Sequence, residues 1–264
     1  MTNETNEKPS VLAVDGDIVA YRTAAVCEDH FEGSCNDILD TTLKTISTDT
    51  GISNMRIYIS GRTNFRYDVA TTKPYKGNRA TMVRPQYLNH CKQYLIDNYK
   101  AIVMHGYEAD DGIATDMTIN GAAHCGIDKD ILQIAGWHYN YVKEEWQHVT
   151  PEEAEITLYR QVLMGDTSDN IPGLPRIGEV KAANAITDHE TAATDAVKYY
   201  EEVCKEKLPD IDFFEYFVEQ LKLIKMITNV DVYKMITTKV DPETEGFEVQ
   251  EGNFEGEELR SIRL

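Results

Sequence analysis

The sequence lacks paired cysteines, long apolar runs and an excess of basic residues. Its five cysteines are odd in number, scattered and without C-x-x-C spacing, which argues against a disulfide framework and against structural zinc. No apolar run approaches the roughly 20 residues of a membrane-spanning helix, and the polar N-terminus is not a signal peptide. These absences favour a cytoplasmic protein, in the host cytoplasm if viral, with reduced thiols and no membrane partner.

Basic residues are outnumbered 26 to 45 by acidic ones, and the net charge is -19. That balance disfavours an extensive nucleic-acid surface, because Lys and Arg contacts to phosphate supply most of the affinity in such complexes. The basic residues are concentrated, however, since residues 56–100 hold nine of them and only two acids. This basic island predicts that nucleic acid contacts a single face of an acidic protein. The alternative is an ordinary solvated, charged loop.

Apolar segments that fit strands alternate with helical patterns along the first part of the chain. Strands are expected at 11–14, 55–60, 101–105 and 122–127, and helices at 18–26, 85–98 and from 109 onward. Such alternation predicts an α/β fold with a mostly parallel sheet. Thr150 to Glu153 form a capping box with Pro151 at the first helical position, so a helix should run to about Met164. Only helices follow, at 179–186, 191–205 and 212–227.

Acidic residues gather in four groups, most of them directly after predicted strands. Ligands of parallel α/β sheets collect at the carboxyl ends of strands, and hard cations such as Mg²⁺ prefer oxygen ligands, so the groups predict a metal site. Each pair alone is more often a helix cap or a surface charge, and Asp17 would equally serve as the N-cap of the first helix. Two acids separated by one residue would face the same way in an extended backbone. The candidate metal ligands are Asp15; Glu108, Asp110 and Asp111; Asp128 and Asp130; and Asp166 and Asp169.

The segment 164–181 joins the last acidic pair to a loop with several glycines. Asp166 and Asp169 lie three residues apart, on one side of a turn. Backbone N–H groups near Gly173 and Gly178 can point at an anion where a helix begins. A metal site would then lie beside a phosphate-binding loop, which is the layout of a metal nuclease. The alternative is a turn-rich loop that ends in a helix cap.

Five motifs occur in a characteristic order along the chain. They are Val14-Asp15-Gly16, Tyr75-Lys76-Gly77-Asn78-Arg79, Glu108-Ala109-Asp110-Asp111, Asp128-Lys129-Asp130-Ile131-Leu132-Gln133, and Gly165-Asp166-Thr167-Ser168-Asp169-Asn170-Ile171-Pro172-Gly173. In this order they resemble the motifs of the flap endonuclease and 5′-to-3′ exonuclease superfamily. The size is similar to that of the bacteriophage replication exonucleases and of the exonuclease domain of bacterial DNA polymerase I. The resemblance covers about residues 11–186, and its specificity comes from the combination of motifs.

The resemblance implies a PIN-like, mostly parallel sheet flanked by helices, with a helical arch at about 62–85 and a helical C-terminal region that carries a helix-hairpin-type DNA-binding element. The resemblance implies that the eight acids named above would be ligands of two Mg²⁺ ions, for which Mn²⁺ would substitute. It also implies that Lys76 and Arg79 would be catalytic cations of the arch and that Tyr75 would be an aromatic that stacks on an unpaired base. A K⁺ ion would bind in the duplex-binding loop. The implied DNA contacts are Arg22, Tyr75, Gly173, Ile177, Gly178 and Lys181.

The sequence departs from the family pattern in two places. Where relatives place an acid after the second strand, this chain reads Ile59-Ser60-Gly61-Arg62, so one metal ligand is missing. Weaker Mg²⁺ binding is expected, and Gly61→Asp should restore it. The interval from Asp111 to Asp128 is also short. By motif the chain divides into a nuclease core with its arch at 9–164, a duplex-binding region at 165–230, and an acidic segment at 231–264 without an assigned role.

We expect a Mg²⁺-dependent 5′ nuclease that removes nucleotides from 5′ ends or cuts 5′ flaps of DNA, and that also accepts RNA–DNA hybrids such as primers. It would act as a monomer, with replication proteins as partners. Two alternatives stay open. A PIN-type ribonuclease would need the carboxylates but not the loop at 173–181. A DNA-binding accessory module with a weakened site would fit the missing acid at Gly61.

Overall fold

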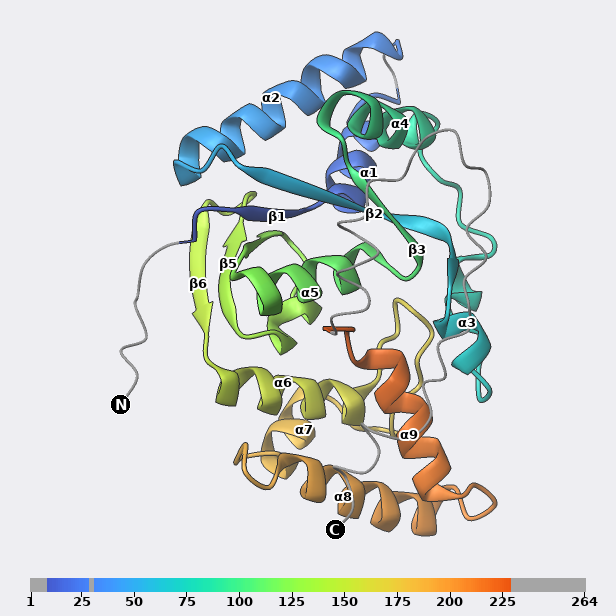
Figure 1. The fold of residues 1–264 in the computed structure, drawn as a ribbon. Helices are drawn as coiled ribbons and strands as arrows, with labels where there is room; N and C mark the ends of the chain where they lie inside the picture. The colour runs from blue at the N-terminus through green and yellow to red at the C-terminus, as the bar shows by residue number, and fades with distance from the viewer. Residues whose placement is uncertain (1–8, 29–30, 229–264) are drawn as a thin grey trace, which may run out of the picture.

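One six-stranded sheet organises the fold, with strands in the order β3-β2-β1-β4-β5-β6 (Figure 1). The computed structural model describes residues 9–28 and 31–228. All neighbouring pairs among β1 to β5 are parallel, and β6 pairs antiparallel with β5. The sheet is mixed and mostly parallel, which confirms the predicted α/β class. The strands are β1 (Leu12–Asp15), β2 (Met55–Asn64), β3 (Ile102–Gly106), β4 (Ala123–Gly126), β5 (Gly136–Asn140) and β6 (Glu145–Val149).

Helices cover both faces of the sheet (Figure 1). Leu12 and Val14 of β1 point into the core beneath α1, α2 and α4, whereas Ala13 between them points into the core beneath α5. This alternation follows from the two-residue period of a strand. Because both faces are buried, β1 reads as a continuous apolar run. The helices of these layers are α1 (Gly16–Val26), α2 (Gly33–Thr50), α4 (Leu88–Tyr99) and α5 (Ala109–Asn120).

The helices after Thr150 form a further layer with its own apolar core (Figure 1). Thr150 Oγ1 accepts a hydrogen bond from Glu153 N at 3.2 Å, and Glu153 Oε2 accepts one from Thr150 N at 2.9 Å. The predicted capping box is therefore confirmed. Past Ile224 the chain returns to the sheet, where Met226 packs with Ala13 and Tyr58. The helices are α6 (Pro151–Met164), α7 (Glu179–Ala185), α8 (Ala192–Lys207) and α9 (Phe213–Ile224).

Several elements differ from the sequence-based expectation. Helix α2 was not predicted, because polar threonines and aspartates dilute its buried stripe. The pairing of β5 with β6 was not predicted either, since β6 is mostly exposed and carries no apolar alternation. The helix expected from 85 begins at Leu88, and Pro85 precedes it in a turn whose carbonyl accepts from Leu88 N at 3.1 Å.

The segment 62–85, expected to be a helical arch, is mostly irregular, so that expectation is wrong for most of its length. Pro74 and Gly77 are poor helix formers and interrupt it. Glu219 of α9 anchors the segment by accepting a hydrogen bond from Thr71 N at 2.7 Å. Its helical parts are the short helix α3 (Arg66–Val69) and the 3₁₀ turn η1 (Gly77–Arg79).

The acidic segment predicted at 231–264, and the last two residues of the predicted 165–230 region, lie outside the described residues. Of the helices that the structure describes, none combines the length and the apolar character needed to cross a bilayer.

Two buried histidines meet across the neighbouring strands β4 and β5. The Nδ1 atoms of His124 and His138 lie 3.2 Å apart, and His138 Nε2 lies 2.9 Å from Ile134 O. A carbonyl only accepts, so His138 carries its proton on Nε2, and its Nδ1 accepts from His124. Burial lowers the pKa of His124 to about 3 and that of His138 to about 4. Both rings are therefore neutral at pH 7.

Acidification should destabilise the protein through this pair. Both histidines titrate near 6.5 in the unfolded chain but stay neutral in the fold until about pH 4, so the unfolded state binds more protons between these values. Each histidine should lower the free energy of unfolding by about 1.4 kcal/mol per pH unit as the pH falls through this window. Urea titrations should give a shallower pH dependence for His138→Gln than for the wild type. Equal slopes would contradict this assignment.

Candidate metal and nucleic-acid site

A cavity of about 190 Å³ opens at the carboxyl edge of the parallel strands. Seven of the eight acids predicted as metal ligands line it, from positions at or shortly after the ends of β1, β3, β4 and α6. The predicted cations Lys76 and Arg79 line it as well. The fold thus gathers acids that are far apart in the sequence. The lining acids are Asp15, Asp17, Glu108, Asp110, Asp128, Asp130, Asp166 and Asp169.

The carboxylates of this cavity are withdrawn from water and repel one another. Burial, with the charges of Asp17 and Asp128 nearby, raises the pKa of Asp15 to about 7. Burial and neighbouring acids raise the pKa of Asp130 to about 6, and they raise that of Asp110 well above its ordinary value. A cation between these groups would make their ionised forms less costly. The cavity is therefore electrostatically suited to positive charge.

Local hydrogen bonds aim the acids that follow β1 and β4. Asp15 is the N-cap of α1, because its Oδ1 accepts from Ile18 N at 3.0 Å. Asp128 Oδ1 accepts from Asp130 N at 2.9 Å, where the 3₁₀ turn η2 (Asp130–Gln133) begins. Asp128 and Asp130 do face the same cavity. They reach it from a turn and not from extended backbone, so that part of the prediction is wrong.

The loop between Gly165 and Gly173 is closed by contacts between its own ends. Asp166 and Ile171 exchange backbone hydrogen bonds of 2.9 and 2.7 Å. Both glycines have positive φ angles, 70° and 56°. A Cβ on Gly165 would lie 2.4 Å from Gly173 N, and one on Gly173 would lie 2.3 Å from Gly165 N. Two glycines are needed here because the backbones touch, and this contact fixes the loop that carries Asp166 and Asp169.

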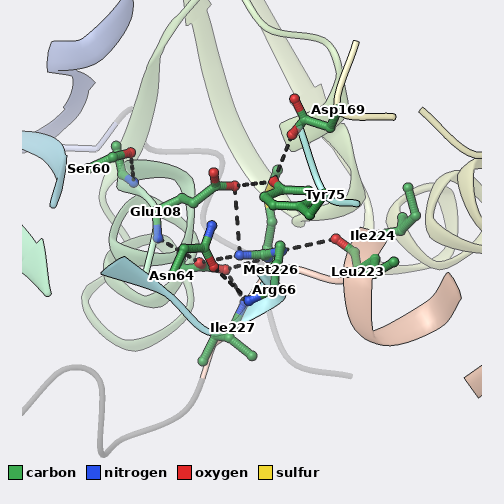
Figure 2. Close-up of polar contacts among 12 residues, drawn as sticks. Ser60, Asn64, Arg66, Tyr75, Glu108, Asp169, Leu223, Ile224, Met226 and Ile227 are labelled. Carbon is green, nitrogen blue, oxygen red and sulfur yellow. Dashed lines mark hydrogen bonds and ion pairs between the residues drawn. The ribbon is translucent and has the colours of Figure 1, made fainter. Parts of the chain in front are cut away.

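Tyr75 joins two of the acids (Figure 2). Its hydroxyl lies 2.8 Å from Glu108 Oε2 and 2.7 Å from Asp169 Oδ2. Burial and these two carboxylates raise the pKa of Tyr75, so it stays a neutral donor. Only 4% of the residue is exposed. The predicted stacking of Tyr75 on a base is therefore wrong for this conformation, because the ring is packed inside and its hydroxyl holds the acids.

Lys76 and Arg79 are paired with the same acids. Lys76 forms an ion pair with Glu108 and lies 3.5 Å from Asp169 Oδ2. Arg79 forms an ion pair with Asp169 and donates to Ser168 O at 3.0 Å. Burial would raise the pKa of Glu108, but the Lys76 and Arg66 charges lower it on balance. Both predicted cations are thus in place beside the cavity.

Asp111 does not belong to the cavity, which corrects its assignment as a metal ligand. The side chain is fully buried, and both its oxygens accept from Arg66, at 2.7 and 2.9 Å. Its oxygens also accept from Glu108 N at 3.0 Å and from Ile227 N at 2.9 Å. Four donors surround one carboxylate and leave no oxygen for a cation. Asp111 is a structural partner of Arg66.

Gly173 does not present its backbone to solvent, contrary to the prediction that it contacts DNA. Its N–H donates to Gln220 Oε1 at 3.0 Å, and its carbonyl accepts from Tyr216 Oη at 2.5 Å. Both backbone groups are satisfied within the protein. Ile177 is also buried, with 9% of its surface exposed, so its role is packing.

Three other residues predicted to contact DNA are accessible. Gly178 begins α7 with no atom within 4 Å of its Cβ position. Lys181 is exposed, and its Nζ donates to Arg176 O at 3.0 Å. Arg22 is exposed as well, but it lines a separate cavity together with Tyr141. The structure therefore separates Arg22 from the acidic cavity.

Ser60 and Gly61 stand where the family pattern has an acid. A Cβ on Gly61 would lie 2.5 Å from Met104 O of the neighbouring strand, so Gly61→Asp would clash rather than supply a ligand, and that expectation is wrong. Ser60 is the residue that lines the cavity, and its Oγ accepts from Ala109 N at 2.9 Å. Asp17 Oδ2 accepts from Ser60 N at 3.1 Å, so Asp17 is part of the cavity wall and not the N-cap.

Three residues of the site were not assigned a role from the sequence. Arg66 is buried, with 3% exposed, and pairs with Asp111. Gln133 and Gln161 line the cavity, and Gln161 Nε2 donates to Asp130 Oδ1 at 3.1 Å. Gln133 could have been noticed as the last residue of an acidic motif. Gln161 carries no sequence signal, because it reads as an ordinary residue of an amphipathic helix.

The donor set fits a hard divalent cation. Among the described residues, no three His, Cys, Asp or Glu side chains are arranged as a ready metal cage. Mg²⁺ does not require one, because it retains several waters and binds through one or two carboxylates. The carboxylate oxygens that line the cavity and the raised pKa values of Asp15 and Asp130 are the features that a Mg²⁺ ion would exploit.

Comparisons with known proteins agree with this geometry. No family model matches the chain. The chain is 28% identical to a 5′-3′ exonuclease of Buchnera aphidicola subsp. Schizaphis graminum, over 66% of this chain and 68% of that protein. It is 26% identical to DNA polymerase I of Bacillus subtilis strain 168, over 94% of this chain and 30% of the polymerase. The chain thus spans two thirds of the first relative and less than a third of the second.

The fold also matches a solved structure, that of the bacteriophage T5 flap endonuclease in a complex with DNA and metal ions. The TM-score is 0.61 at 19% identity, over 88% of this chain and 95% of that one. The fold and the acidic cavity define the class: an α/β protein with a mixed, mostly parallel six-stranded sheet and carboxylates at its carboxyl edge. The chain is thus similar in sequence to a 5′-3′ exonuclease and in fold to a flap endonuclease.

Metal binding to this cavity should release protons. Asp15 and Asp130 titrate at about 7 and about 6, so each is partly protonated near neutral pH and must lose its proton to bind a cation. The affinity for Mn²⁺ should therefore fall as the pH drops from about 8 to about 6. Calorimetry in two buffers of different ionisation enthalpy measures the protons released, and Asp15→Asn should release fewer. A pH-independent affinity would show that these acids do not bind the metal.

Proposed function

We propose that the protein is a Mg²⁺-dependent, structure-specific 5′ nuclease that acts on DNA as a 5′-to-3′ exonuclease, a 5′ flap endonuclease or both. The observation that carries the proposal is that one cavity gathers seven acids matching the family motifs, with Lys76 and Arg79 lining it. Phosphodiester hydrolysis needs bound cations and positive charge facing the phosphate. RNA–DNA hybrids such as primers would also be substrates. The protein would act as a monomer, alongside replication proteins.

The acids fall into two groups by position along the sheet edge. Asp15, Glu108 and Asp110 follow β1 and β3 and would hold one Mg²⁺. When bound, two such ions lower the pKa of the attacking water and neutralise charge on the phosphate, and Mn²⁺ fits the same oxygen ligands. Asp111 is left out, because Arg66 already neutralises it. The second group consists of Asp128, Asp130, Asp166 and Asp169.

Lys76 and Arg79 would act on the phosphate. Their present partners are the carboxylates of Glu108 and Asp169. A substrate phosphate offers the same charge, so each cation can exchange a carboxylate for a phosphate oxygen and stabilise the charge that develops in the transition state. Tyr75 would keep Glu108 and Asp169 oriented during this exchange, because its hydroxyl contacts both.

Duplex DNA would be gripped away from the cavity. Gly178 leaves its backbone accessible at the start of α7, and Lys181 lies one turn further on. Arg176, also exposed, adds a third contact for the phosphate backbone. A K⁺ ion in the same loop would add positive charge there, and Arg22 would contact a different part of the strand. Such contacts set the distance between the duplex and the cut.

One observation favours a second candidate function. The chain has Ser60 and Gly61 where the family motif supplies an acid, and of the two only Ser60 lines the cavity, so the protein could be a DNA-binding accessory module with a weakened site. Seven retained acids argue against this. A PIN-type ribonuclease finds no support in the arrangement, because it has no use for the exposed loop that holds Gly178 and Lys181.

The experiment that tests the function is cleavage of end-labelled flap, duplex and single-stranded DNA, with and without Mg²⁺. The wild type should release products from the 5′ end of flap and duplex substrates only with the metal. Asp166→Asn should abolish cleavage but retain or improve DNA binding, because removing an acid reduces repulsion of phosphate. Full Mg²⁺-dependent turnover by Asp166→Asn would overturn its assignment. Binding without cleavage by the wild type would establish the accessory function instead.

Variants of two lysines should separate chemistry from affinity. Lys76→Ala should slow single-turnover cleavage by at least ~10²-fold, as loss of one preorganised charge often does. Lys181→Ala should weaken duplex binding modestly and flatten its salt dependence, as expected for a phosphate contact. Lys143→Ala, at an exposed turn away from the cavity, serves as the control and should change neither. If Lys76→Ala lowers only DNA affinity, its catalytic role is wrong.

A further inference from the structure

The segment 223–227, where α9 ends and the chain turns back to the sheet, contacts the supports of both acid groups. α9 ends at Ile224, and the segment continues without regular structure. The last carbonyls of a helix have no partner within the helix and are often left to water. In this structure the carbonyls of residues 223–225 and the N–H groups of Met226 and Ile227 are bonded to side chains beside the acidic cavity.

On one side, Arg66 binds the segment (Figure 2). Its Nε donates to Leu223 O at 2.9 Å, and its Nη2 donates to Lys225 O at 3.0 Å. The same guanidinium holds both oxygens of Asp111 and lies 3.7 Å from Glu108 Oε2. A planar guanidinium with five N–H donors can satisfy carbonyls and a carboxylate at once in a fixed geometry. The position of Glu108 is thereby linked to the end of α9.

On the other side, Gln133 binds the segment. Its Oε1 accepts from Met226 N at 2.9 Å, and its Nε2 donates to Ile224 O at 3.1 Å. The same Nε2 donates to Gln161 Oε1 at 2.9 Å, and Gln161 Nε2 donates to Asp130 Oδ1 at 3.1 Å. Both glutamines are more than nine-tenths buried. A chain of neutral amides thus connects the end of α9 to a carboxylate of the other acid group.

These contacts constrain the distance between the two groups of acids. Successive residues of the segment bond alternately to the two sides: Leu223 O and Lys225 O accept from Arg66, whereas Ile224 O and Met226 N bond to Gln133. Arg66 and Gln133 therefore cannot shift relative to each other without breaking buried hydrogen bonds. An unmade buried hydrogen bond costs about 1–3 kcal/mol. The Arg66 charge and the glutamine amides also orient acids without adding negative charge to a crowded site. A site for two cations requires such a fixed separation.

We propose that residues 223–227 form a strut that sets the spacing of the two acid groups, with Arg66 and Gln133 as its positioning residues. This inference rests on the proposed function, since it concerns the same cavity. Neither residue is proposed to touch substrate. They act through Glu108 on one side and through Gln161 and Asp130 on the other.

The first test measures Mn²⁺ binding by calorimetry without DNA, for the wild type, Arg66→Lys and Gln133→Met. Each variant should bind Mn²⁺ about 10-fold more weakly, the loss typical when a partner behind a metal ligand is removed. Tyr200→Phe is the matched control, because it loses a buried hydrogen bond of 2.7 Å to Val162 O but none of the hydrogen bonds that residues 223–227 make. Wild-type affinity in both variants, or an equal loss in the control, overturns the proposal.

The second test combines Arg66→Lys and Gln133→Met. If both residues act through one strut, the first substitution already releases it, and the double variant should lose less affinity than the two single losses together. Strictly independent losses would show two unrelated contacts and overturn the strut. Because the readout is metal binding, a wild type that binds Mn²⁺ but does not cut DNA would contradict the proposed function and still allow this comparison.

A third measurement uses the wild type alone, so it tests the strut proposal even if either variant fails to fold. The amides of Met226 and Ile227 lie outside any helix, yet they donate to Gln133 and Asp111. Hydrogen exchange should show both amides protected, and Mn²⁺ should slow their exchange further, because coupling between metal and strut is reciprocal. Rapid exchange that Mn²⁺ does not change would overturn the proposal.

Discussion

Repulsion among carboxylates at one edge of the sheet is the constraint on which the rest of this structure depends. Two like charges about 4 Å apart cost about 4 kcal/mol even at an effective dielectric constant near 20. The protein places seven acids of the family motifs around one cavity, where burial and, to a smaller extent, this repulsion raise the pKa values of Asp15 and Asp130. Hydrogen-bond donors and cations that face these acids make the arrangement tolerable. An acidic cavity of this kind is stable enough to fold and still favours binding of cations.

The cations that face the acids are of two kinds. Arg66 and Asp111 form a buried pair with almost no exposed surface, and removing one partner of such a pair typically costs about 3–5 kcal/mol. Lys76 and Arg79 are more exposed, and their ion pairs are made to acids that a metal would also engage. The first pair therefore holds the frame of the site, whereas the second pair of residues can exchange partners. This division explains why neighbouring basic residues of one segment have different roles.

Much of the fold was predictable from local patterns. The parallel strands and most helices follow from periodicity, and the capping box at Thr150 marked the start of α6 within one residue. The exceptions have physical causes. Helix α2 is stabilised by packing rather than by propensity, and the segment 62–85 is anchored by Glu219 in an irregular path. The side chains of β6 are mostly exposed, so its sequence carries no strand pattern. This strand can be recognised only from its pairing with β5.

For the site, the sequence by itself determined which acids follow strands and turns, because strand ends, caps and turns are local. Only the tertiary structure decided which of them face the cavity. Asp110 and Asp111 are adjacent and chemically identical, but they project about 100° apart on a helix, so Asp110 enters the cavity and Asp111 meets Arg66. The burial of Tyr75, the steric block at Gly61 and the use of Gln161 likewise depend on residues from distant elements. Contacts of that kind arise only when the chain is folded, and no local pattern encodes them.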